Sequence, residues 1–141
     1  MKLSIIEEIM SNEFTKNHIL GLVDEKGKPL DAVIHTFTGI DKGDPHDHPY
    51  EFQSTILSGW YIEEYYSPHK PSISWTRCRV KGEKFTVSYN HIHKIIDISP
   101  NGCNTIILPQ DKIQEPGFWK FENGKAYRRQ WNETEFKLYE I

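Results

Sequence analysis

Two histidines separated by a single residue, His46 and His48, carry the clearest chemical signal in the sequence. They lie between Pro45 and Pro49, and the carboxylate of Glu51 follows closely. If the pair occupies the end of a strand, the period of two places both rings on one side, with their Cα atoms roughly 6.5 Å apart. Two imidazoles so placed can share one ion at the ordinary Zn–N distance of about 2.0–2.1 Å. The spacing therefore predicts the first half of a metal site.

The composition limits the kind of protein that carries this pair. The 141 residues suffice for one domain, and 37% hydrophobic with 26% charged residues is typical of a globular chain. A net charge of −3 without a basic block argues against a nucleic-acid or anionic-membrane partner, and no apolar run approaches the roughly 20 residues of a membrane span. Glu7 and Glu8 interrupt any signal peptide, and the two cysteines have no CxxC spacing, so we expect a cytoplasmic, reduced protein.

A helix followed by many short strands would position these side chains. Leu3, Ile6, Met10 and Phe14 recur at three- and four-residue steps, which predicts an amphipathic helix within residues 1–18. Further along, β-branched and aromatic residues alternate with polar ones between Gly, Pro and Asn turn signals. The expected strands lie at residues 19–23, 30–38, 52–66 (one strand bent at Gly59, or two), 72–80, 85–89, 92–98, 105–108, 118–121, 126–131 and 136–139. About ten such strands predict a sandwich or barrel.

The histidine pair also resembles a known motif. A histidine–any–histidine sequence followed by a carboxylate and a glycine, here His46, His48, Glu51 and Gly59, resembles the first motif of the cupin family. The second cupin motif supplies another histidine from a facing strand, and His93 is its match. More narrowly, the stretch HDHPYEFQSTILSGWYIEEY is similar to a group of small bacterial and phage cupins described as cysteine-dioxygenase-like.

Weaker matches to the same group follow in the expected order. They are the segments 93–95, 102–105 and 116–119. The resemblance thus covers about residues 30–135 and implies a cupin jelly-roll barrel (double-stranded β-helix). Together with the apolar periodicity of residues 1–18 and the length of the chain, the expected fold is all-β with a short N-terminal helix: a single domain over residues 1–141, with residues 1–18 helical and residues 30–135 forming the barrel.

The carboxylate of the predicted metal site has two candidates. Only Pro49 and Tyr50 separate His48 from Glu51, whereas the usual cupin spacing is longer and reaches Gln53. Strict alternation puts neither candidate on the face of His48, so one residue of bulge is needed, and Pro49 is a natural place for it. An anionic oxygen stabilises a divalent ion more than a neutral amide does, which favours Glu51.

The remaining histidine also has two candidates, His91 and His93, which share one strand face. The opposite face carries Ile92, Ile96 and Ile98, and this richer apolar face would be expected to point inward. The choice of His93 therefore rests on the resemblance, with the isoleucines packed on a second face. The complete predicted metal set is His46, His48, Glu51 and His93.

This ligand set predicts a divalent transition metal, with Fe, Mn, Ni and Zn left undistinguished. Imidazoles and one carboxylate with open positions are typical of non-haem iron sites, so our first hypothesis is a metal-dependent, dioxygenase-like enzyme acting on a small polar molecule. A cupin that binds a small ligand without catalysis is the alternative, and a sugar isomerase or epimerase is a third. Exposed strand edges further suggest a homodimer.

Overall fold

Antiparallel strands make up the regular secondary structure of residues 2–140, the part of the chain that this computed structural model describes. The strands are β1 (Ser4–Ile9), β2 (Phe14–Leu20), β3 (Ala32–Phe37), β4 (Phe52–Ser58), β5 (Trp60–Tyr66), β6 (Ser74–Val80), β7 (Lys84–Val87), β8 (Ile92–Ile98), β9 (Cys103–Pro109), β10 (Gly117–Glu122), β11 (Lys125–Gln130) and β12 (Lys137–Leu138). The prediction of an all-β fold is confirmed.

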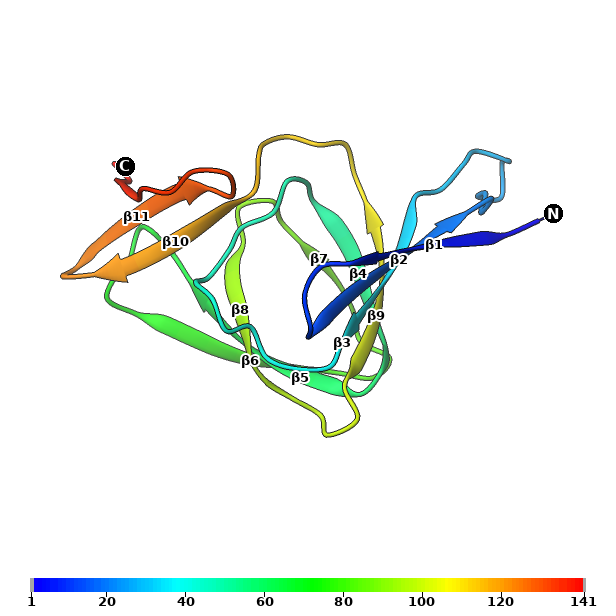
Figure 1. Ribbon diagram of the computed structural model, residues 1–141, viewed down its shortest axis with the longest axis horizontal. Helices are drawn as coiled ribbons and strands as arrows, with labels where there is room; N and C mark the ends of the chain where they lie inside the picture. The colour runs from blue at the N-terminus through cyan, green and yellow to red at the C-terminus, as the bar shows by residue number, and fades with distance from the viewer. Residues whose placement is uncertain (1, 141) are drawn as a thin grey trace.

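The strands are arranged as a barrel with a hairpin at each end (Figure 1). One sheet has the order β1-β2-β3-β9-β4-β7, a second has the order β6-β5-β8, and β10, β11 and β12 form a third. The first two sheets curve around a common interior, and the β1–β2 and β10–β11 hairpins lie at opposite ends of the molecule in Figure 1. Strands distant in sequence pair antiparallel, as β3 does with β9 and β5 with β8, which is the connectivity of a jelly roll.

Alternating side chains of both sheets fill the interior. In β4 the buried positions are Phe52, Ser54 and Ile56, and the positions between them are more exposed. Ile56 packs with Tyr61 from β5 and Ile95 from β8 in one buried cluster, so the core joins the two sheets. Burial of these apolar side chains is the main force that holds the sheets face to face.

A glycine separates β4 from β5. Gly59 adopts a φ of 75°, and a Cβ at this position would lie 2.2 Å from the carbonyl oxygen of Gly102. Only glycine fits this turn without strain. Of the two readings of residues 52–66, the structure therefore has two strands.

The predicted N-terminal helix is wrong, because residues 4–20 form the β1–β2 hairpin. The backbone N–H groups of Met10 and Ser11 both donate to the carbonyl of Phe14 and close the turn. The three- and four-residue spacing resembled a helix, but β-branched isoleucines favour a strand, and β2 gains a full ladder with β3. Within residues 2–140 there is accordingly no helix that could cross a membrane.

Candidate functional site

The histidine pair lies on a short extended segment, residues 45–48, that runs between β8 and β10. The backbone N–H of His46 donates to the carbonyl of His93 at 2.9 Å, and the N–H of His93 donates back to the carbonyl of His46 at 3.0 Å. On the other side, the N–H of Asp47 donates to the carbonyl of Gly117 at 2.9 Å. Directly paired residues of neighbouring strands point to the same face, so this bridge sets the rings of His46 and His93 side by side.

The rings of His46, His48 and His93 converge. Their ligand atoms all lie within 4.8 Å of one another, and Nε2 of His48 is 3.1 Å from Nε2 of His93. The ring centroid of His46 is 4.9 Å from that of His93 and 5.4 Å from that of His48. Strand alternation thus works as the sequence suggested, and it brings together three of the four residues of the predicted metal set. We call these three residues the histidine triad.

The triad suits a metal ion in its spacing and its protonation. Two ligands about 2.0–2.1 Å from one ion lie roughly 2.9–3.4 Å apart for angles between perpendicular and tetrahedral, which brackets the distance between His48 and His93. Burial, and next the charges of His93 and His91, lower the pKa of His46 to about 3. Burial and the neighbouring imidazoles also hold the pKa of His48 well below its ordinary value. Both rings are therefore neutral near neutral pH, the form in which imidazole binds metals.

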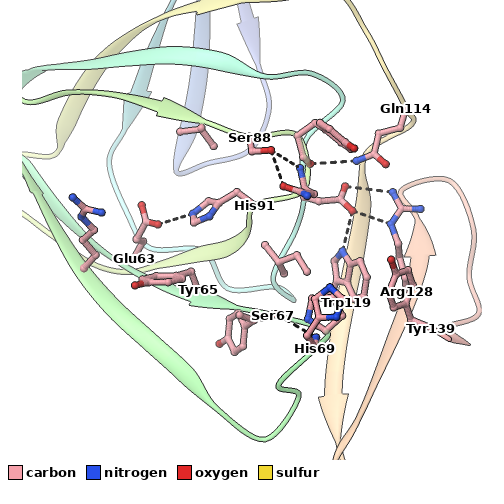
Figure 2. A pocket seen from close by; sticks show the side chains of 18 of the residues that line it. Glu63, Tyr65, Ser67, His69, Ser88, His91, Gln114, Trp119, Arg128 and Tyr139 are labelled. Atoms are coloured by element: carbon pink, nitrogen blue, oxygen red, sulfur yellow. Dashed lines mark hydrogen bonds and ion pairs between the residues drawn. The ribbon is translucent and has the colours of Figure 1, made fainter. Parts of the chain in front are cut away.

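Asp47, between the two histidines, anchors the segment. Its side chain points away from the triad and is only 4% exposed. The carboxylate accepts hydrogen bonds from the backbone N–H of Gly117 at 2.7 Å, the indole N–H of Trp119 at 2.9 Å and Nε of Arg128 at 2.8 Å. Trp119 and Arg128 lie close together in Figure 2, where dashed lines mark their hydrogen bonds. The hairpin of β10 and β11 thereby fixes the segment that carries two members of the triad.

Glu51 does not join the triad. Its side chain is exposed, and it lines a different pocket together with Gln53. The position of β4 that points into the barrel is Phe52, which is 8% exposed and whose ring centroid is 5.1 Å from that of His48. Phe52 lines the cavity of the triad, whereas Glu51 and Gln53 do not, so an apolar ring rather than a carboxylate or an amide lies beside His48.

A carboxylate that the sequence analysis missed, Glu63, lies behind the triad. Its side chain is 1% exposed, its Oε1 is 2.7 Å from Nε2 of His91, and its Oε2 is 3.7 Å from Nδ1 of His93. Figure 2 shows Glu63 and His91 paired at the wall of a pocket. Burial alone would raise the pKa of Glu63, but the hydrogen bond from His91 and the nearby rings of His91 and His93 lower it below its ordinary value. An ionised Glu63 therefore faces the side of His93 opposite the triad.

Glu63 could have been found from the alternation of β5. Tyr61, Glu63 and Tyr65 occupy every second position, and Tyr61 is a buried core residue. The bulge between Ile62 and Glu63 in the pairing with β8 sets which histidine Glu63 meets. This irregularity has no signature in the sequence.

Both faces of β8 are packed. Ile92 lies in a cluster with Trp119 and Ala126 from the β10–β11 hairpin, and His93 and Ile95 are buried at 8% and 4% exposure. Ile92 thus packs against the hairpin, Ile98 packs against the interior cluster of Ile56, and His93 lines the barrel cavity. His91 shares the face of His93 and forms with Glu63 and His93 a second group of close ligand atoms, also within 4.8 Å of one another, so His93 belongs to both groups.

Two cavities adjoin this cluster. One, of about 250 Å³, lies inside the barrel and is lined by all three histidines of the triad. The other, of about 710 Å³, is lined by Glu63 and His91 and by none of the triad. Any open coordination position on an ion held by the triad would therefore face the smaller cavity.

Comparison with known proteins gives the fold. No family model matches the sequence. No curated protein matches it either. Solved structures of cupin-fold proteins do match, which places the chain in the cupin fold.

Three of these structures illustrate the likeness. The capsular polysaccharide assembling protein CapF from Staphylococcus aureus aligns with a TM-score of 0.59 and 10% identity, over 79% of this chain and 29% of CapF. The polyketide cyclase RemF from Streptomyces resistomycificus aligns with a TM-score of 0.56 and 15% identity, over 93% of this chain and 82% of RemF. Oxalate decarboxylase from Bacillus subtilis, described with Mn(II) centres, aligns with a TM-score of 0.57 and 14% identity, over 79% of this chain and 29% of its own.

Proposed function

We propose that this protein is a metal-dependent enzyme in which His46, His48 and His93 hold a divalent transition metal that acts on a small molecule in the barrel cavity. The observation that carries the proposal is the convergence of the three rings, with Nε2 of His48 and Nε2 of His93 3.1 Å apart at the wall of that cavity. The Mn(II) centres described in the oxalate decarboxylase of similar fold are consistent with it.

The ligand set determines what the ion supplies. A divalent ion held by three neutral imidazoles would keep its full charge, so it would supply a Lewis acid for an oxygen or sulfur atom of a bound molecule or, as iron, a centre for oxygenase chemistry. The apolar ring of Phe52 stands next to His48, where it adds no charge. The ligand set of three histidines differs from the set with a carboxylate, Glu51, that the sequence suggested.

The residues around the triad keep it in place. Glu63 faces Nδ1 of His93 and favours the tautomer with the proton on that nitrogen, which leaves Nε2 free to bind metal. Asp47 holds the segment of His46 and His48 against the β10–β11 hairpin. The aromatic and aliphatic side chains of the cavity exclude water from the reacting molecule, which strengthens electrostatic interactions at the ion.

Metal content tests the site directly. We expect the purified protein to carry one equivalent of metal, as isolated or after loading with Fe(II), Mn(II) or Zn(II), by elemental analysis. His46→Ala, His48→Ala and His93→Ala should each lose it, since two imidazoles hold a divalent ion much less tightly than three. The circular dichroism spectra of these variants should retain the β signal.

Two variants serve as controls. His69→Ala removes an exposed histidine, and Glu51→Gln removes the exposed carboxylate, so both should keep their metal. Full metal content in the three triad variants, or loss in His69→Ala to the same degree, would contradict the proposal. Oxygen consumption by the Fe(II)-loaded protein over a panel of thiols, small acids and phenols then tests the oxygenase reading, which fails if turnover equals that of His48→Ala.

A further inference from the structure

The cavity that the triad faces has mainly apolar walls. Phe14 and Phe37 stack on one side with ring centroids 4.6 Å apart and an interplanar angle of 12°. Phe52, Tyr61 and Ile107 contribute further wall from three other strands. A cavity of about 150 Å³ lined by apolar side chains suffices for benzene, so the roughly 250 Å³ here fits a molecule of one or two rings. Sugars and other strongly hydrated molecules would lose more water contacts in this cavity than its walls replace.

His35 is the residue of this wall that has an unpartnered buried nitrogen and lies outside the triad, within residues 2–140. His35 lies on the inner face of β3, in the register between Val33 and Phe37, and lines the cavity. Its Nε2 is buried and has no hydrogen-bond partner within residues 2–140. The rings of Phe14 and Phe37 meet the imidazole edge-on, at centroid distances of 4.9 and 5.8 Å. An unsatisfied buried polar atom is unfavourable, so a ligand that supplies its hydrogen bond binds more tightly than one that does not.

The charge of His35 limits which ligands it can bind. Burial, with smaller contributions from the charges of Lys16 and His18, lowers the pKa of His35 to about 3. The ring is therefore neutral near pH 7 and offers one N–H donor and one lone pair but no positive charge. A hydroxyl or carbonyl group suits it, and a carboxylate or phosphate gains no ion pair from it.

We propose that the barrel cavity binds an uncharged aromatic molecule of one or two rings whose hydroxyl or carbonyl group hydrogen-bonds to His35. Its rings pack against Phe37 and Tyr61. This assignment names the substrate class of the proposed enzyme and so rests on the proposed function, but the binding itself requires no metal. It also replaces the small polar molecule suggested by the sequence with a largely apolar one.

Binding to the chelator-treated protein tests the assignment without metal chemistry. Naphthol and naphthalene share one shape and differ by a single hydroxyl group, and ligand fluorescence follows both. Wild-type protein should bind naphthol more tightly than naphthalene. His35→Leu should weaken naphthol binding by about three- to tenfold, the range expected for one hydrogen bond, and leave naphthalene binding unchanged. His35→Gln should restore part of the difference, and His69→Leu, at an exposed position, should change neither affinity.

The outcomes separate this inference from the proposed function. Equal affinity of wild-type protein for the two ligands, an equal loss for both in His35→Leu, or no binding of either ligand would overturn the assignment. A thermal melt of each variant shows whether it is folded. If His35→Leu does not fold, the comparison of the two ligands is made with His35→Gln instead. Metal content of His35→Leu equal to wild type would show that the triad is independent of His35. Absence of metal in wild-type protein that still binds naphthol would refute only the metal-dependent enzyme.

Discussion

Replacing Asp47 by asparagine should destabilise the protein without touching any member of the histidine triad. The substitution keeps the size of the side chain but removes the charge that faces Arg128, whose Nε lies 2.8 Å from the carboxylate. It also places an amide beside the N–H donors of Gly117 and Trp119. The amide oxygen can accept a hydrogen bond, but the amide nitrogen cannot.

The magnitude follows from the burial of the pair. Removing one partner of a buried ion pair costs about 3–5 kcal/mol, and the Arg128 side chain, 22% exposed, places this pair at the lower end, near 3 kcal/mol. The unfolding entropy of about 2.1 cal/mol/K per residue gives roughly 0.3 kcal/mol/K for 141 residues. A loss of about 3 kcal/mol therefore lowers the Tm by about 10 °C.

Thermal melts of metal-free Asp47→Asn, followed by circular dichroism, measure this shift. Asp111→Asn is the matched control, because Asp111 is exposed. We also expect Asp47→Asn to lose about 10- to 100-fold in metal affinity, the usual effect of removing a group that orients metal ligands. If Asp47→Asn melts within about 2 °C of Asp111→Asn and binds metal as tightly, the carboxylate does not anchor the site.

Two further predictions concern pH and association. Because the pKa of His35 is about 3 in the folded protein and 6.5 for an ordinary histidine, the unfolded chain binds a proton that the folded chain excludes, so stability falls as the pH drops from 6.5 toward 3. Between about pH 7.5 and pH 5 this residue should contribute roughly 2 kcal/mol of the loss, and urea titrations of metal-free His35→Leu should show that much less pH dependence than wild type; equal dependence would refute the assignment. β1 is an edge strand with Ile5 and Ile9 exposed at 62% and 71%, so we expect a homodimer paired through this edge, with a light-scattering mass twice the 16.6 kDa of one chain. Ile5→Lys with Ile9→Lys should give the mass of one chain, and a wild-type monomer would contradict this expectation.

Local alternation was sufficient to predict that His46 and His48 lie close together. His46 and His48 share a face because one residue separates them in an extended segment, and this required no knowledge of distant strands. The same rule applied to β4 would have selected Phe52 as the inward residue. The assumption of a bulge at Pro49 led instead to Glu51, which is exposed.

The features that the sequence did not reveal depend on pairing between distant segments. Glu63 meets His91 and His93 because β5 pairs with β8 through a bulge. The N-terminal segment is a hairpin because β2 pairs with β3, although its apolar spacing fits a helix equally well. Local patterns cannot distinguish these outcomes, since tertiary hydrogen bonding overrides intrinsic propensity.

The anchoring of Asp47 has a consequence for shortened forms of the chain. A protein ending before Gly117 would contain all three histidines of the triad. It would lack Gly117, Trp119 and Arg128, which donate hydrogen bonds to the Asp47 carboxylate. Such a truncation would remove the contacts that hold the segment of His46 and His48 in place. The C-terminal hairpin supplies no member of the triad, but the boundary of the functional unit extends through it.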